Sequence, residues 1–150
     1  MEFLALLAVP IVGAVILAFF GASRFAPEAN AAISAATFVA ACALTARVIS
    51  EGSIIAANEQ FFIDPFNVFL VTLTAFVSLN TSLFSRPYMR IEREHSRVTS
   101  AQLRRYRSRY QLFIAAMLIA LTTNNMGLMW VAMEAATLST VLLVTLYRTP

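Results

Sequence analysis

The chain has 150 residues, of which 59% are hydrophobic and 13% are charged, and its formal net charge is +3. An ordinary soluble domain carries about 25% charged residues, so this composition predicts a membrane protein and excludes a soluble enzyme. At about 20 apolar residues for each crossing, the length holds about four to six spanning helices and no separate water-soluble domain. All eleven basic residues are arginine, and Cys42 and His95 are the single cysteine and the single histidine.

The scarcity of cysteine and histidine limits the cofactors that the chain can hold. An iron–sulfur cluster needs several cysteines, and a haem in the membrane needs at least one histidine inside a span. His95 lies in the most charged stretch of the sequence, and the sequence contains no zinc motif and no glycine-rich phosphate loop. We therefore expect no cofactor, no metal site and no catalytic centre within this chain.

Three apolar runs in the first half of the chain predict the first three membrane helices. Residues 3–20 are uncharged and would be about 27 Å long as a helix, and a short turn separates them from a second apolar run over 31–49. After a polar segment, Asp64 and Pro65 have the pattern of an N-cap followed by the first helical position, which predicts a third helix over 65–85. Capping is the simplest interpretation of Asp64, and a secondary role in a proton pathway is the alternative.

The segment 86–109 is strongly basic, with eight arginines against two glutamates and a net charge of +6. Such a segment cannot lie in the hydrocarbon core. Between two spans it is typical of a loop that stays on the cytoplasmic side and contacts anionic lipid, and we prefer this interpretation to nucleic-acid binding. The residues expected to anchor the loop at the lipid surface are Arg86, Arg90, Arg104, Arg105, Arg107 and Arg109.

The last apolar region, residues 110–147, would be about 57 Å long as one helix and must therefore turn back on itself. A polar cluster at 122–127 marks the turn, which predicts a fourth span over 110–123 and a fifth over 126–147. The fourth span is short, so we expect part of the basic segment to extend it. The whole prediction is an all-α, polytopic membrane helix bundle of about five transmembrane helices, forming a single membrane domain over 1–150.

The distribution of arginine predicts the orientation of this bundle. If the N-terminus faces outside, ten arginines, including Arg148, lie inside and only Arg47 lies outside, whereas the opposite orientation reverses this bias. We therefore predict an outside N-terminus and a cytoplasmic C-terminus.

Glu134 is the single charged residue of the last apolar region and lies near the middle of the predicted fifth span. An ionisable side chain at that depth costs on the order of 3 kcal/mol, so by default it marks a pathway or a partner. A carboxylate can be protonated when dry and ionised when water or a cation arrives, which is the chemistry of a proton relay. The alternative is a protonated glutamic acid that only hydrogen-bonds to a neighbouring helix.

Helical spacing divides the fifth span into two useful faces. A face of small residues is suited to close helix packing. The stripe that contains Glu134 also holds Thr137, whose hydroxyl would lie beside the carboxylate in the proton pathway. The other residues of this stripe are Gly127, Trp130, Val141 and Thr145, and the small residues are Ala132, Ala135, Ala136 and Ser139.

At these positions the sequence resembles a known family. Two segments carry the resemblance, FFIDPFNVFLVTLTAFVSLNTSLFSRPYMR at 61–90 and TTNNMGLMWVAMEAATLSTVLLVTLYRTP at 122–150. They are similar to the N-terminal portion of the antiporter-like membrane subunits of respiratory complex I, Mrp-type antiporters and membrane-bound hydrogenases, and most of all to hydrogenase-4 component F. The arrangement NN-x-GL-x-W-x3-E is the most specific part.

The resemblance implies that Glu134 is the proton-channel glutamate of the fifth span, which pairs in this family with a lysine on a later helix. This sequence has no lysine and ends at Pro150, so we expect it to be either a piece of a larger subunit, completed by another polypeptide, or a truncated relative. The first case makes the chain part of a proton-translocating module in a complex-I-like or hydrogenase-linked respiratory assembly, with Glu134 as a buried proton carrier. The second makes it a non-catalytic structural or assembly subunit. In both cases the expected partners are other membrane subunits and anionic lipid.

Overall fold

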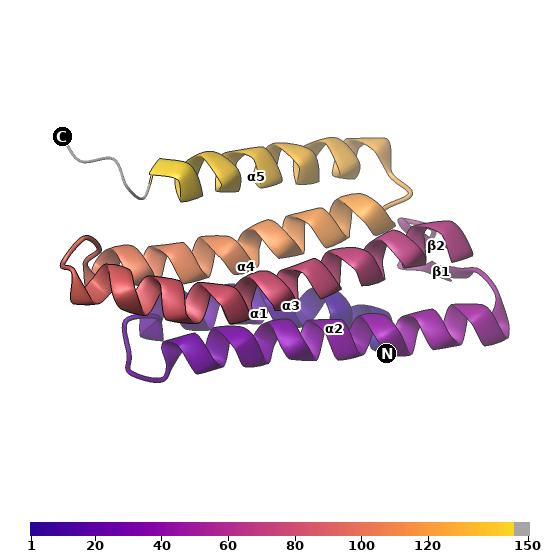
Figure 1. Cartoon of the computed structure of the whole chain (residues 1–150). Coiled ribbons are helices and arrows are strands. Elements are labelled where there is room, and N and C mark those ends of the chain that lie inside the picture. Colours follow the sequence, from indigo (N-terminus) through magenta and orange to yellow (C-terminus); the bar gives the residue numbers. More distant parts are fainter. Residues whose placement is uncertain (146–150) are drawn as a thin grey trace.

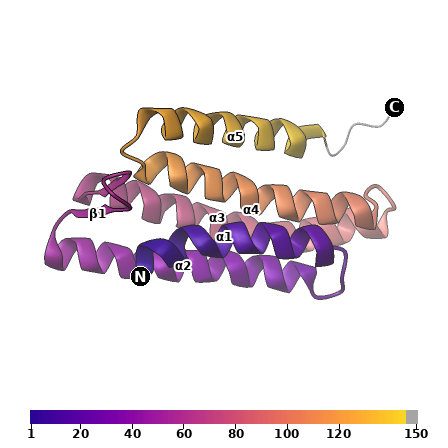
Figure 2. The same ribbon diagram turned by 180° about the vertical axis from the view of Figure 1, so that it is seen from behind.

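The computed structural model describes residues 1–145, which form five helices and one small hairpin. The helices run roughly antiparallel in layers, with α5 outermost on α4 and with α2 on the opposite side of the bundle (Figures 1 and 2). In chain order the elements are α1 (Glu2–Phe20), α2 (Ala26–Glu51), β1 (Ile54–Ala56), β2 (Phe61–Ile63), α3 (Pro65–Glu94), α4 (Ser100–Thr122) and α5 (Met126–Val144).

The predicted all-α membrane bundle is confirmed. Four of the helices, α1, α2, α3 and α5, are long and apolar enough to cross a membrane. The fifth, α4, carries four arginines in its first half, but it lies at the centre of the bundle and packs against α1, α3 and α5. Because other helices cover so much of its surface, α4 does not need to be apolar on every side.

The basic segment 86–109 is mostly helical and not the loop that the sequence led us to expect. α3 continues past the predicted end of the third span, through Pro87 to Glu94, and α4 already begins at Ser100. A capping box starts α4. The Thr99 hydroxyl accepts from the backbone N–H of Gln102 at 3.2 Å, and the side-chain oxygen of Gln102 accepts from the backbone N–H of Thr99 at 2.8 Å. The short fourth span is therefore extended backwards into the basic segment, as expected.

The polar segment between α2 and α3 forms an antiparallel hairpin that the sequence analysis did not predict. Ile54 pairs with Ile63 across the two strands, and positive φ angles at residues 57–59 reverse the chain. The hairpin closes one end of the bundle, because Ile63 is fully buried and the Phe61 ring lies 4.9 Å from that of Phe3 on α1.

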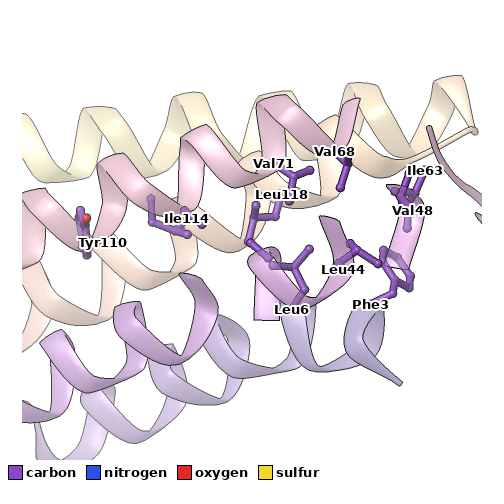
Figure 3. Close-up of a cluster of buried hydrophobic side chains, with 12 residues drawn as sticks. Phe3, Leu6, Leu44, Val48, Ile63, Val68, Val71, Tyr110, Ile114 and Leu118 are labelled. Carbon is purple, nitrogen blue, oxygen red and sulfur yellow. The ribbon is translucent and has the colours of Figure 1, made fainter. Parts of the chain in front are cut away.

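The main apolar core extends from this hairpin to the middle of the bundle (Figure 3). It combines residues from α1, α2, β2, α3 and α4, so all four of these helices are needed to complete it. Its members are Phe3, Leu6, Ala41, Leu44, Val48, Ile63, Val68, Val71, Ala75, Tyr110, Ile114 and Leu118.

The antiparallel order of the helices separates the charges into two groups. We call residues 21–28 and 86–109, where the α1–α2 and α3–α4 turns lie together, the basic end; its nine arginines and three glutamates give a formal charge of +6. The opposite end contains residues 1–2 and 47–64, whose one arginine and four acidic residues give −3. Arg148, which the predicted orientation also places inside, lies outside the described residues.

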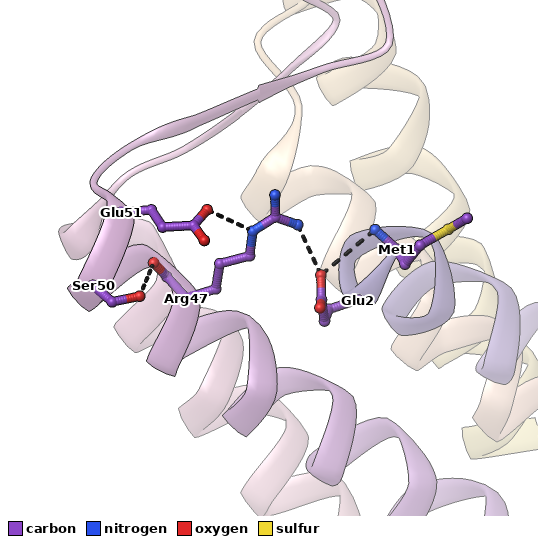
Figure 4. Close-up of polar contacts among 5 residues, drawn as sticks. All are labelled: Met1, Glu2, Arg47, Ser50 and Glu51. Atoms are coloured by element: carbon purple, nitrogen blue, oxygen red, sulfur yellow. Dashed lines mark hydrogen bonds and ion pairs between the residues drawn. The ribbon is translucent and has the colours of Figure 1, made fainter.

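Arg47 joins two helices at this opposite end (Figure 4). Its Nη1 donates to Glu2 Oε2 at 2.9 Å, and its Nε donates to Glu51 Oε2 at 2.9 Å. The start of α1 is thereby held beside the end of α2. Exposed ion pairs add little to stability, so we assign this contact to positioning.

We predict that Ser53 and Ser100 lie on opposite sides of the membrane, because both are exposed and they lie at opposite ends of the bundle. Single cysteines at these positions in a Cys42→Ala background should react oppositely with an impermeant thiol reagent, with position 53 labelled from the outside. Labelling of position 100 from the outside would show that the orientation is inverted.

α1 and α2 approach each other closely at Gly13, where an added Cβ would lie 2.7 Å from Ile33 Cγ2. Gly13→Ala should therefore lower the free energy of unfolding by about 1–3 kcal/mol, measured in detergent micelles. Ile33→Ala removes the clashing atoms, so Gly13→Ala should cost much less in that background. Val39→Ala, at an exposed position of α2, serves as the control and should give no such rescue. Equal losses in all three backgrounds would contradict the close approach.

Candidate functional site

The start of α5 is fixed by the two asparagines of the NN-x-GL motif. Asn125 Oδ1 caps the helix by accepting from the amides of Gly127 at 2.9 Å and Leu128 at 3.1 Å. The side-chain Nδ2 of Asn125 donates to Gln60 Oε1 at 2.9 Å, and the side-chain Nδ2 of Asn124 donates to the backbone carbonyl of Glu59 at 3.1 Å. The motif therefore begins α5 and ties it to the hairpin.

The small-residue face of α5 packs against α4, as predicted. The buried residues of α5 are Ala132, Ala136 and Ser139, and Ala135 is half-buried beside them. Further along the pair, Arg109 on α4 donates to the Leu142 carbonyl at 3.0 Å, close to the end of α5. An arginine near the last carbonyls of a helix is favourable, because that end carries partial negative charge. α4 thus positions α5 along much of its length.

Glu134 lies on the other side of α5 and is exposed. Within residues 1–145 it has no hydrogen-bond or ion-pair partner. The expectation that Glu134 is buried is therefore wrong for this chain taken alone, since α5 is the outermost helix and its small residues occupy the face that packs. The rest of the predicted stripe is exposed with it: Gly127, Trp130, Thr137, Val141 and Thr145.

Thr137 shares this outward face with Glu134. Its hydroxyl donates to the Met133 carbonyl of its own helix at 2.9 Å. The hydroxyl proton is thus engaged, while the oxygen can still accept a hydrogen bond from a neighbouring group.

Asp64 has the capping role that was its simplest interpretation. Its Oδ1 accepts from the backbone N–H of Asn67 at 2.7 Å, and Asn67 Oδ1 accepts from the backbone N–H of Asp64 at 2.8 Å. Together the two bonds form a capping box. Asp64 lies at the start of α3, at the hairpin end of the bundle, whereas Glu134 lies halfway along α5. These contacts give Asp64 a structural function and add no evidence for a role in proton transfer.

The arginines expected to anchor a loop at the lipid surface have several different environments. Arg107 differs most from the expectation, because it is only 7% exposed and its Nη1 donates to the Gly21 carbonyl at 2.6 Å. Arg86 pairs with Glu28 at 2.6 Å. Arg104, Arg105 and Arg109 line a cavity of about 170 Å³ beside α1, and Arg90 is exposed on α3.

A buried polar cluster between α2 and α4 was missed by the sequence analysis. Gln111 is fully buried, and its Nε2 lies 2.8 Å from Asn30 Oδ1 and 3.1 Å from Ser34 Oγ. Its Oε1 has no partner among the described residues. A glutamine at the start of an apolar run was the available signal in the sequence. The main apolar core, which includes Leu44 and Leu118, is built from the same helices.

The side chains that bind metals remain scattered. Across residues 1–145, no three His, Cys, Asp or Glu side chains come together in a way that could hold a metal ion. Cys42 is exposed on α2, and the ring Nδ1 of His95 lies 2.8 Å from the Ile91 carbonyl at the end of α3. Among the described residues, Glu134 is the one carboxylate that lies at the middle of an apolar helix.

Comparison with known proteins supports the expected family. No family model matches the chain. The chain is 37% identical, over 145 residues and 97% of its length, to the hydrogenase-4 component F homolog of Methylacidiphilum infernorum (isolate V4). The matched region is 29% of that protein, so the chain spans less than a third of this relative. The predicted resemblance is thus confirmed: the chain is a multi-pass membrane protein that is similar to one portion of this hydrogenase-4 component F homolog.

Proposed function

We propose that the chain is part of a proton-translocating, antiporter-like module in a complex-I-like or hydrogenase-linked respiratory assembly of a bacterial inner membrane, with Glu134 as the proton carrier. The observation that carries this proposal is the position of Glu134, which is exposed at the middle of the apolar helix α5. Leaving a lone carboxyl group against hydrocarbon costs on the order of 3 kcal/mol. A neighbour that covers it and offers a polar partner removes that cost.

The remainder of a longer subunit, or another polypeptide, would supply this neighbour. The relative from Methylacidiphilum infernorum is more than three times as long as the matched region, which leaves ample sequence for further helices. The family resemblance implies a lysine on one of them. Dry surroundings favour the protonated form of a carboxyl group, and an approaching ammonium group or water favours the ionised form. A carrier of this kind takes up and releases a proton as those surroundings change.

Thr137 would assist this exchange as a second polar group on the same face. Because its hydroxyl proton is bonded to the Met133 carbonyl, the oxygen is left to accept from protonated Glu134 or from a water molecule. The first four helices would act as the support. The main apolar core lies among them, and we place the proposed proton route along the outer face of α5, where Glu134 is exposed.

The alternative function is that of a non-catalytic structural or assembly subunit. One observation favours it: the buried members of the main apolar core come from α1–α4 and the hairpin, and from α5 the partly buried Leu143 packs against them. In that case the outer face of α5 would serve only for docking, and Glu134 would remain a protonated hydrogen-bonding group.

Replacing Glu134 separates the two functions. Glu134→Gln keeps the size of the side chain and its ability to hydrogen-bond but cannot release a proton. In the native assembly, reconstituted in vesicles, this variant should assemble normally and lose about tenfold or more of its proton transport, since removal of a positioned acid–base group has effects of that size or larger. Proton uptake measured with a pH-sensitive dye is the readout.

The matched control is Glu59→Gln, which alters an exposed carboxylate in the hairpin turn and should leave transport unchanged. If Glu134→Gln assembles and transports protons like the unaltered protein, Glu134 is not the carrier and the structural function replaces the proposal.

A further inference from the structure

We infer that a cavity at the basic end is a binding site for the phosphate group of an anionic phospholipid. The cavity has a volume of about 410 Å³. Three parts of the chain that are distant in sequence line it: the α1–α2 turn with the start of α2, the last turns of α3, and the first half of α4. Five arginines contribute to its wall, namely Arg24, Arg86, Arg90, Arg93 and Arg107.

The charge in this cavity is far from balanced. Glu28 is the one acidic residue in its wall, and it pairs with Arg86 at 2.6 Å. Within residues 1–145, no carboxylate forms an ion pair with Arg24, Arg90 or Arg93. Five arginines and one glutamate therefore leave a formal charge of +4 around one space. Positive groups held this close repel one another, and a bound anion relieves the repulsion.

The arrangement of the guanidinium groups is suited to phosphate. Arg86, Arg90 and Arg93 are four and three residues apart on α3, a spacing that places them on one face of the helix. Arg107 faces them from α4 and is held in place by its hydrogen bond to the Gly21 carbonyl. A guanidinium group has five N–H donors, so this bond leaves most of its donors for a ligand. Paired N–H donors match the oxygens of a phosphate group.

The start of α2 adds a further favourable contribution. Pro27 and Glu28 in its first turn line the cavity, and no side chain caps this helix. The amino end of a helix carries partial positive charge and is a common place for phosphate to bind. Together with the arginines, it makes the cavity positive on several sides.

A lipid fits the cavity better than a soluble phosphate compound. The rest of the wall is apolar and consists of Pro27, Met89 and Leu103. Next to the wall in sequence are Phe25, 73% exposed, and Tyr88, 51% exposed, and aromatic residues are enriched where membrane helices meet the headgroups. The cavity also lies at the end of the spanning helices, where basic pockets bind anionic headgroups. A phosphate group could enter among the arginines while its acyl chains remain beside apolar side chains.

The test compares two pairs of arginines. Arg90→Gln/Arg93→Gln removes two cavity arginines, both of them exposed, so the fold should be preserved. Arg104→Gln/Arg105→Gln removes the same charge from the same end of the protein but outside this cavity. The full chain, delipidated in a zwitterionic detergent and checked for helicity, is titrated with phosphatidylglycerol, and bound lipid is counted by native mass spectrometry.

The cavity variant should bind phosphatidylglycerol about tenfold more weakly, which is the effect expected for lost charge-assisted hydrogen bonds. The control variant should change by less than about twofold. Phosphatidylcholine should not bind to the site, and inorganic phosphate in millimolar excess should not displace phosphatidylglycerol. Equal weakening in both variants would show only diffuse attraction by the basic end, and displacement by inorganic phosphate would show a site for free anions; either result overturns the proposal.

Discussion

The hydrocarbon core of a membrane excludes unpaired charge, and this constraint explains the arrangement of charged residues in the described part of the chain. Antiparallel helices bring nine arginines to the basic end, while Arg47, Glu2 and Glu51 form a small cluster at the other. Glu134 is the exception, because it lies at the middle of an apolar helix and faces outward. The described helices already form an apolar core, but they provide no partner for the Glu134 carboxyl group. The proposed function therefore requires a neighbour that packs on the outer face of α5.

α4 connects the features that bear on function. It is the central helix, and two of its polar side chains bond to other helices: Tyr110 donates to the Ser78 carbonyl at 2.6 Å, and Ser108 donates to the Ala14 carbonyl at 2.8 Å. Arg107 belongs to the wall of the basic cavity, and Arg109, two residues later, holds the last carbonyls of α5. A phosphate group in the cavity would contact Arg107 and so bind to the same helix, α4, that positions α5 and its Glu134. Buried polar groups of this kind are costly to leave unpaired, so they fix α4 in one position among its neighbours.

The sequence alone was sufficient for the features that depend on local patterns. Apolar run length predicted the helices, Asp64 with Pro65 predicted the start of α3, and the polar cluster before Met126 predicted the turn into α5. Features that depend on tertiary packing were not accessible. Hydropathy cannot show that α4 lies inside the bundle, where arginines and Gln111 are tolerated, nor that the hairpin closes one end. Helical periodicity separated the two faces of α5 and identified the small-residue face as suited to packing. It could not show that α5 is the outermost helix, and so the exposure of Glu134 was not foreseen.

Photo-crosslinking from the outer face of α5 tests the central claim most directly. Leu138, which is 61% exposed and one helical turn beyond Glu134, can be replaced by a photoreactive amino acid in the native assembly. If Glu134 is covered by another helix, irradiation should join this position to a defined polypeptide segment, identified by mass spectrometry, and that segment should carry a lysine. Crosslinks to lipid alone would show that the outer face of α5 meets the bilayer, and they would contradict a proton carrier at Glu134.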